Sequence, residues 1–247
     1  MTLHYDGTDF HGWQVQAGVR TVQQELERAL ERLTTLPVRA SAAGRTDAGV
    51  HATGQVVSAD VPAKWHPAEL RRALNAVLPN DVWVEAAEDA AVDFHARFSA
   101  IDRAYEYRIG TAALAASPFY NRVCWVVDEP LDPLLLDRCA NLLLGEHSFR
   151  AFAKTGQEAR GDRSRVHDSK WWAWPPVGIA FRIRANRFLH HMVRYLVGTM
   201  VDVATGRRPL EDVQRMLDGD AAVRTSPPAP PNGLVLVGVG YPETGGA

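Results

Sequence analysis

The sequence predicts an α+β fold made of two similar halves that share a mixed, mainly antiparallel sheet. Segments with helical periodicity alternate along the chain with short runs in which apolar and polar residues alternate. Two long helical segments fall in each half, separated by strands. We place the halves at residues 1–100 and 101–247, although they share no convincing sequence identity with each other.

Composition fits a globular protein. Of 247 residues, 46 % are hydrophobic and 23 % are charged, which is unlike a disordered chain. No stretch reaches the roughly 18 uncharged apolar residues of a membrane span, and the first residues lack the basic cluster and apolar run of a secretory signal. The two cysteines suit reduced core thiols better than a disulfide framework or a metal site. We therefore expect a cytoplasmic protein.

Two amphipathic helices are expected in the first half. Apolar residues recur at helical spacing over residues 22–34, and Thr21 followed by Gln24 predicts a capping box at the start. The second helix begins at Pro67 and ends before Pro79.

The remaining elements are predicted from the same two patterns, helical spacing of apolar residues and alternation of apolar with polar residues. Strands are expected at residues 38–42, 55–61, 82–88, 103–111, 167–174, 179–185 and 234–241, and helices at 132–144, at 187–205 and from 209. Within residues 103–111, Tyr105, Tyr107 and Ile109 share one predicted face. Residues 43–54 form the loop that joins two of these strands.

The loop carries charged and polar side chains that can serve as catalytic or binding groups. Residues 44–52 place arginine, threonine, aspartate and histidine side chains among small residues, where a backbone can approach a ligand closely. A purely structural alternative is a turn formed by Thr46 and Asp47, with a left-handed Gly49 and with Arg45 paired to a nearby acid. Both interpretations are compatible with the local sequence.

Residues 44–52 resemble the catalytic signature of the A-type tRNA pseudouridine synthases, whose essential aspartate falls on Asp47. Other blocks resemble that family in the same order along the chain, at residues 5–7, 12–16, 93–100, 103–107, 188–194 and 233–234. The resemblance covers nearly the whole chain. It implies the pseudouridine synthase fold, with two α+β halves around a central cleft.

An isomerase activity follows from this resemblance. Such an enzyme converts uridines at positions 38–40 of the tRNA anticodon stem-loop to pseudouridine: the bond from N1 to C1′ is cut, the uracil rotates, and C5 joins C1′. No cofactor, redox step or external group donor is needed. Asp47 would supply the required carboxylate, acting either covalently or on the ribose. The resemblance also implies a homodimer with tRNA as its partner.

Four further site residues are implied by the resemblance. Tyr105 would stack on the target base and manage the C5 proton, and Arg194 would pair with Asp47 and keep it ionised. Arg45 would enter the gap left by the flipped nucleotide, and Leu234 would lie beneath the flipped uracil. The alternatives are a buried strand aromatic for Tyr105, a surface side chain for Arg194 and an ordinary core position for Leu234.

The net charge of the chain is only -2, so a nucleic-acid partner would have to bind to a local basic stretch. From Arg150 to Arg194 we count ten Lys or Arg residues against three acids. We expect Arg160, Arg163 and Arg165 to hold phosphates. The alternative is a solvated face.

The nine histidines, with His190 and His191 adjacent, do not predict a metal site, since neighbours on a helix point about 100° apart and no metal-binding spacing accompanies them. We expect no metal. Two other functions stay open: a non-catalytic RNA-binding module, and an aspartyl-nucleophile hydrolase, which would normally need a second acid and Mg²⁺ near Asp47.

Overall fold

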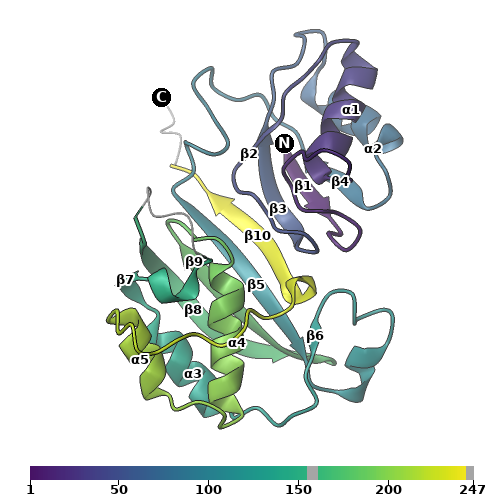
Figure 1. Ribbon diagram of the computed structural model, residues 1–247. Helices are drawn as coiled ribbons and strands as arrows, with labels where there is room; N and C mark the ends of the chain where they lie inside the picture. The colour runs from purple at the N-terminus through teal and green to yellow at the C-terminus, as the bar shows by residue number, and fades with distance from the viewer. Residues whose placement is uncertain (155–160, 243–247) are drawn as a thin grey trace. The chain divides into compact units, whose positions relative to one another are not determined.

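A computed structural model describes residues 1–154 and 161–242, and the chain divides into two compact units (Figure 1). The first unit holds Met1–Arg103 together with the described residues from Val235 onward, and the second holds Ala104–Leu234. The division expected from sequence assigned all residues after 100 to one half. The structure groups the last strand with the first unit instead.

The strands of the first unit have the order β4-β1-β3-β10, with β2 paired to β3. These strands are β1 (Thr2–Tyr5), β2 (Ser41–Ala42), β3 (His51–Ser58), β4 (Val82–Ala86) and β10 (Leu234–Gly240). Strand β1 runs antiparallel to β3 and to β4, and β2 runs antiparallel to β3. Strand β10 runs parallel to β3, with Val235 opposite His51. This pairing agrees with the grouping of the residues from Val235 onward with the first unit.

Helices α1 (Val22–Thr34) and α2 (Pro67–Val77) pack against each other in this unit. The predicted bounds of α1 are confirmed, but the predicted capping box is wrong, because the Thr21 side chain makes no capping hydrogen bond. The first helical amides donate instead to backbone carbonyls, from Val22 to Gly12 at 3.2 Å and from Gln23 to Trp13 at 3.0 Å. The segment before α1 therefore caps the helix.

The strands of the second unit have the order β5-β9-β8-β7, with β6 paired to β5. Its strands are β5 (Asp102–Gly110), β6 (Trp125–Val126), β7 (Gly145–Ser148), β8 (Arg163–Trp174) and β9 (Gly178–Ala185). Strand β8 pairs antiparallel with both β7 and β9. It starts four residues before the expected position because its first part, from Arg163 to Val166, pairs with β7. The expected α+β class and the mainly antiparallel pairing are confirmed.

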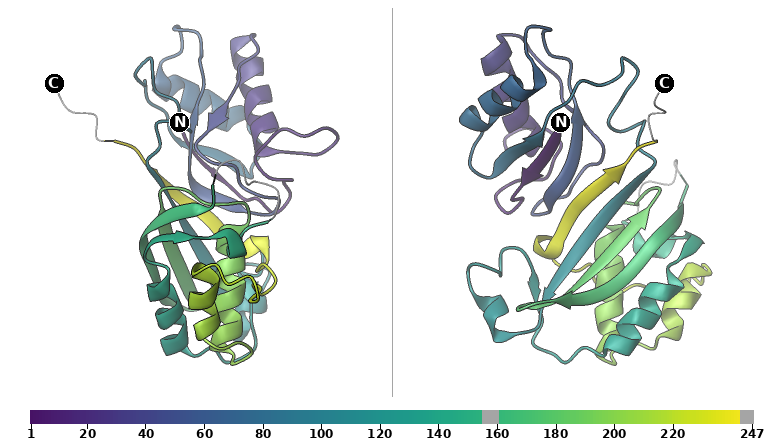
Figure 2. Two further views of the ribbon diagram at one scale, coloured as in Figure 1. Left: turned by 60° about the vertical axis from the view of Figure 1, so that its left-hand side comes forward. Right: turned by 180° about the vertical axis from the view of Figure 1, so that it is seen from behind.

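Helices α3 (Pro133–Leu142), α4 (Met192–Ala204) and α5 (Glu211–Leu217) group on one side of these strands (Figure 2). Asp132 caps α3 by accepting hydrogen bonds from the amides of Leu134 and Leu135. Short 3-10 turns complete the unit at Ala113–Ala116, Arg150–Phe152 and Pro231–Gly233. None of the helices in the described ranges has the length and apolar character needed to span a membrane.

Helix α4 starts later than the sequence predicts. We expected a helix from Arg187, but the helix begins at Met192, after His191 in the left-handed conformation with a φ of 63°. Side-chain bonds hold the preceding residues on β8 instead: Ser164 donates to the carbonyl of Arg187 at 2.6 Å, and Asn186 accepts from the amide of Arg165 at 2.9 Å. These contacts take residues 186 and 187 out of the helical path.

Candidate active site

The segment that carries Asp47 joins β2 to β3 in the first unit. The expected loop of residues 43–54 is shorter in the structure, because β3 already begins at His51. Exposure alternates along the loop: Arg45 is exposed, Thr46 is buried and Asp47 is half-buried. The amide of Val50 donates to the carbonyl of Asp47 at 3.1 Å, and Gly49 has a φ of 78°. A turn therefore spans Asp47 to Val50, one residue later than the Thr46 and Asp47 turn of the structural alternative, and Gly49 is left-handed as that alternative predicts.

A buried polar cluster holds the first part of this loop. The hydroxyls of Tyr5 and Thr46 lie 2.8 Å apart. The side-chain amide of Gln55 donates to the Tyr5 hydroxyl at 3.3 Å and to the carbonyl of Gly44 at 2.8 Å. Burial raises the pKa of Tyr5 to about 12, so its hydroxyl stays protonated well above neutral pH. The Tyr5 hydroxyl thus accepts from Gln55 and also shares a hydrogen bond with the Thr46 hydroxyl, in which either oxygen can donate.

The segment from Gly7 to Trp13 lies along the same loop at backbone distance. The amide of Trp13 donates to the carbonyl of Thr46 at 3.1 Å, and the amide of Gly49 donates to the carbonyl of Phe10 at 3.2 Å. Gly12 has a φ of +85°, and a Cβ there would lie 2.6 Å from the Thr46 carbonyl oxygen. A Cβ on Gly7 would collide with the carbonyl oxygen of Val50. Glycine is required at both positions.

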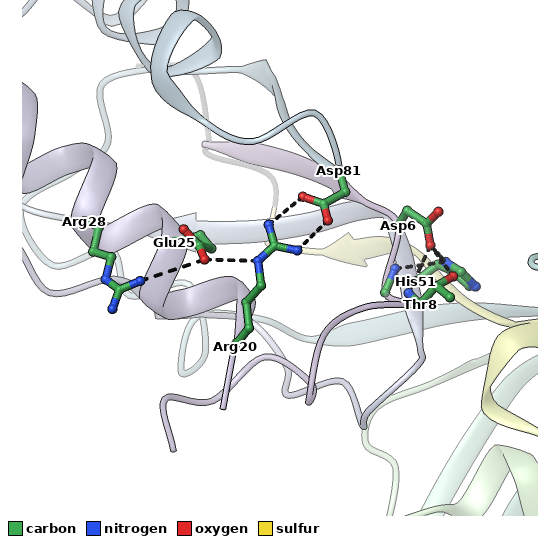
Figure 3. Close-up of polar contacts among 8 residues, drawn as sticks. Asp6, Thr8, Arg20, Glu25, Arg28, His51 and Asp81 are labelled. Atoms are coloured by element: carbon green, nitrogen blue, oxygen red, sulfur yellow. Dashed lines mark hydrogen bonds and ion pairs between the residues drawn. The ribbon is translucent and has the colours of Figure 1, made fainter. Parts of the chain in front are cut away.

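The end of the loop is tied down through His51, as Figure 3 shows. The amide of Gly7 donates to His51 Nδ1 at 3.0 Å, and Asp6 Oδ1 lies 3.2 Å from the same nitrogen. Asp6 in turn accepts hydrogen bonds from the amide and the hydroxyl of Thr8. The amide of Asp6 donates to the backbone carbonyl of Asp81 at 3.0 Å, which links this cluster to the start of β4.

A second charged cluster, centred on Arg20, binds the side chain of Asp81 and holds the same region (Figure 3). Arg20 makes two hydrogen bonds to the Asp81 carboxylate, at 2.6 Å and 2.9 Å, and one to Glu25 at 3.1 Å. Its guanidinium also lies 4.2 Å from the centre of the Phe10 ring. Phe10 is the residue whose carbonyl accepts from Gly49, so this cluster supports the segment beside the loop.

Sequence reasoning missed these anchors. The available signal was the pair of glycines at positions 7 and 12 in the blocks that resemble the family, but spacing alone does not reveal what they approach. A further anchor is Arg103, whose guanidinium donates to the carbonyls of Ala43 at 2.8 Å and of Arg97 at 3.0 Å. The loop is thus held at its beginning, in its middle and at its end.

In the second unit, β5 presents the tyrosine face that the sequence predicts. Tyr105, Tyr107 and Ile109 are all buried. On the other face, Arg108 donates to Glu106 at 2.8 Å. The Tyr105 ring meets the Phe188 ring edge to face, with centroids 5.0 Å apart. The predicted alternation along β5 is confirmed, whereas the stacking of Tyr105 on a base stays a prediction.

Arg194 lies in the first turn of α4, not two turns into a helix from Arg187 as expected. Its Nε donates to the carbonyl of Ala229 at 2.7 Å, and the amide of Ala229 donates back to the carbonyl of Arg194 at 2.9 Å. The Tyr107 hydroxyl donates to the carbonyl of Pro230 at 2.7 Å. The proline-rich segment before β10 therefore runs between α4 and β5, and it leads directly to the buried Leu234.

The predicted site residues belong to different units: Arg45 and Asp47 lie on one loop of the first, while Tyr105, Arg194 and Leu234 belong to the second. The pairing of Arg194 with Asp47 stays a prediction. His190 and His191 precede α4, so their expected placement on a helix is wrong, and their ring centroids are 4.1 Å apart.

The basic stretch is partly neutralised by an acid outside it. On β8, Arg163 Nε donates to Glu146 at 3.0 Å and an Arg165 guanidinium nitrogen donates to the same carboxylate at 3.1 Å. Glu146 lies on the neighbouring strand β7, which the sequence did not predict. The hydrogen bonds from Arg163 and Arg165 lower the pKa of Glu146. Arg160, also expected to hold phosphate, lies outside the described residues.

Comparisons with known proteins agree along the whole chain. The model of a family described as tRNA pseudouridine synthase matches residues 1–99 and 139–242. A tRNA pseudouridine synthase A from Solidesulfovibrio magneticus is 42 % identical, over 99 % of this chain and 91 % of the relative. Proteins of the same name from Paraburkholderia phymatum and Gloeobacter violaceus are each 40 % identical over 98 % of this chain, and over 90 % and 80 % of their own lengths.

Proposed function

This chain belongs to the tRNA pseudouridine synthase family, and from that premise we propose that it isomerises uridines 38–40 of the tRNA anticodon stem-loop, with Asp47 as its essential carboxylate. The enzyme class is an isomerase. The observation that carries the role of Asp47 is the set of anchors around its loop, because a carboxylate that must meet one reacting centre needs a fixed position.

The reaction breaks the bond from N1 to C1′ and forms a bond from C5 to C1′, while C5 gives up its proton and N1 gains one. Asp47 acts on the ribose of the target nucleotide, either by forming a covalent bond to it or by removing one of its protons. Arg194 pairs with the carboxylate and keeps it charged. The bond from its Nε to the carbonyl of Ala229 supports this role, since it fixes the course of the side chain and so gives the guanidinium a defined position.

The remaining roles concern the base and the RNA stem. Tyr105 stacks on the target uracil and manages the C5 proton, and Leu234 lies beneath the ring; the burial of both side chains supports apolar contact with a base. Arg45 enters the space that the flipped nucleotide leaves in the stem. Its exposure next to the buried Thr46 supports this role.

One assay separates this function from its rivals. Transfer RNA transcribed with C5-tritiated uridine is incubated with the protein in the presence of a chelator, and tritium released to water is counted. A synthase releases tritium at the modified uridines, whereas an RNA-binding module or a metal-dependent hydrolase releases none. Mapping the product should place pseudouridine at positions 38–40. Tritium release that maps only outside the anticodon stem-loop would contradict the proposed substrate.

We also propose that the protein works as a homodimer in the cytoplasm, where it meets its tRNA substrate. Support comes from the size of the substrate, because one chain of 27.2 kDa has little surface to grip a tRNA on both sides of an active site. Light scattering at micromolar concentration should give twice the mass of the chain. A monomer mass in a sample with full activity would contradict the dimer.

A further inference from the structure

We propose that Tyr5, Thr46 and Gln55 form a positioning network that sets the directions of the Arg45 and Asp47 side chains during catalysis. The inference rests on the proposed function of Asp47. None of the three is proposed to touch the substrate. They act through the loop, so they are positioning residues and not catalytic ones.

Thr46 is more deeply buried than the residues on either side of it. Thr46 is 6 % exposed, and its hydroxyl lies 2.8 Å from that of Tyr5. Its neighbours differ, since Arg45 is exposed and Asp47 is half-buried. Holding the Thr46 side chain in the interior fixes the backbone at this residue, and the side chains of Arg45 and Asp47 leave the chain from positions next to that fixed point.

Gln55 connects two points of the loop through hydrogen bonds. Gln55 is fully buried, and its amide group donates to both the Tyr5 hydroxyl and the carbonyl of Gly44. The Tyr5 hydroxyl can accept from Gln55 and still share a hydrogen bond with Thr46, because it has one hydrogen and two acceptor lone pairs. One glutamine thus holds the loop at residue 44 directly and at residue 46 through Tyr5. Removing any member leaves a buried polar group without its partner, so the network favours a single arrangement.

Backbone hydrogen bonds also hold the loop, independently of the Thr46 side chain. The carbonyl of Thr46 accepts from the amide of Trp13, and the amide of Gly49 donates to the carbonyl of Phe10. These bonds involve no side-chain atom of the loop, so they persist in a variant such as Thr46→Val, which has nearly the same shape. The expected defect is a misdirected carboxylate on a folded loop, and it should lower kcat more than it raises KM.

The test uses Tyr5→Phe, Thr46→Val, the double variant and the rescue variant Thr46→Ser. Each is assayed for kcat and KM in the tritium-release reaction with the full-length protein, and for thermal unfolding. Two control variants lose a hydrogen-bonded hydroxyl in the same unit, away from the loop: the half-buried one of Tyr241 and the buried one of Thr34. Tyr241→Phe loses a bond to the carbonyl of Ala96 at 2.7 Å, and Thr34→Val loses one to the carbonyl of Leu30 at 2.8 Å.

We expect kcat to fall about 10-fold or more in each single variant, with KM changed by less than about twofold. The double variant should be no slower than the slower single variant, because both break one network. Thr46→Ser keeps the hydroxyl and should stay within about threefold of the wild type. The control variants should lose thermal stability without losing kcat.

An unchanged kcat in both Tyr5→Phe and Thr46→Val, with an active wild type, would overturn the positioning role and leave the proposed function intact. Effects on kcat that multiply in the double variant would overturn it as well. If Thr46→Val does not fold, Tyr5→Phe, which keeps the ring, makes the same comparison with Tyr241→Phe. A wild-type protein that releases no tritium would overturn the proposed function, and this inference with it.

Discussion

Asp47 is surrounded in sequence by residues whose own hydrogen bonds lead to separate parts of the first unit. The backbone of Thr46 is bound by Trp13, its side chain by Tyr5, and the amide of Gly49 by Phe10. A side chain that must stabilise a short-lived species acts best when its position is fixed before the reaction begins, because no further ordering is then required. At the scale of single residues, these neighbours determine how well one carboxylate can work.

Replacing Asp47 by Asn tests the charge while it preserves the shape. The amide keeps most hydrogen-bonding positions, so we expect folding and tRNA affinity to stay within about threefold of the wild type, while kcat falls by roughly 1,000-fold or more. Tritium release and filter binding of tRNA measure the two quantities. The exposed Asp60 provides a matched control, and Asp60→Asn should remain fully active. Turnover by Asp47→Asn, after deamidation has been excluded by mass spectrometry, would contradict an essential carboxylate.

At the scale of secondary-structure elements, sequence periodicity predicts the helices and strands whose apolar residues repeat at a regular spacing. The bounds of α1 were predicted because its apolar stripe repeats at helical spacing, and β5 because its buried and exposed residues alternate. The two-residue β6 and the four-residue β7 are too short to carry such a pattern. The start of β3 at His51 was missed because small residues give no strand signal, while pairing with β1 and β10 imposes the strand.

The candidate site was predictable only in part for a related reason. The resemblance to the family located Asp47 and the blocks around it, but the side chains that hold the loop come from far along the chain. Tyr5 is 41 residues from Thr46, and Gln55 is 50 residues from Tyr5. No local pattern encodes such distances. The late start of α4 has the same origin, since it depends on bonds from β8 to residues 186 and 187.

The close approach of Gly12 to the Asp47 loop gives a prediction at this scale. Gly12→Ala forces alanine into a positive φ, at a cost of about 1–2 kcal/mol, and places a methyl group against the Thr46 carbonyl. Gly18 is a matched control, because it also has a positive φ but has nothing within 4 Å of an added Cβ. We expect Gly12→Ala to lower the unfolding temperature more than Gly18→Ala does. It should also lower kcat, measured by tritium release, whereas Gly18→Ala should not.

Equal losses of stability in the two glycine variants would show that conformation alone is responsible. Equal values of kcat in the two would show that the backbone of residue 12 does not support the Asp47 loop.

The pairing of β7 with β8 changes what the basic stretch is expected to do. Because Glu146 accepts from both Arg163 and Arg165, these arginines present less positive charge to RNA than their number suggests. Glu146→Gln should therefore tighten tRNA binding and steepen its dependence on salt, while the double variant Arg163→Ala with Arg165→Ala should flatten that dependence. Filter binding at several salt concentrations measures both slopes.

The control for net charge is Glu129→Gln, which removes an acid that pairs with Arg207, outside the basic stretch. A salt slope that changes equally in Glu146→Gln and Glu129→Gln would mean that only total charge matters. In that case residues 163 and 165 form a solvated face.

At the scale of the whole molecule, chain order and spatial grouping differ. The chain leaves the first unit after Arg103 and returns at Val235, so the second unit is an insertion within the first. A division drawn from sequence order alone assigns the last strand to its neighbours along the chain. The parallel pairing of β10 with β3 instead assigns it to the first unit, next to the strand that follows the Asp47 loop.

Both units bury tyrosine hydroxyls, and this gives a prediction for the stability of the whole protein at alkaline pH. Burial raises the pKa of Tyr5 and of Tyr241 in the first unit to about 12, and it raises the pKa of Tyr107 in the second unit well above the usual value of 10. Between pH 10 and about 12 the unfolded chain therefore loses protons that the folded chain keeps. The free energy of unfolding should fall as pH rises through this window, by up to about 1.4 kcal/mol per pH unit for each fully buried tyrosine.

Below about pH 9 these tyrosines are protonated in both states and contribute no pH dependence. Denaturant unfolding at pH 8, 10 and 11 measures the effect, and absorbance at 295 nm reports how many of the six tyrosines ionise before the circular dichroism signal is lost. Tyr5→Phe should make the decline in stability shallower, because one shifted group is removed. Ionisation of all six tyrosines in a single step near pH 10, with the native circular dichroism spectrum retained, would contradict the burial of these hydroxyls and the hydrogen bond that Tyr5 makes to Thr46.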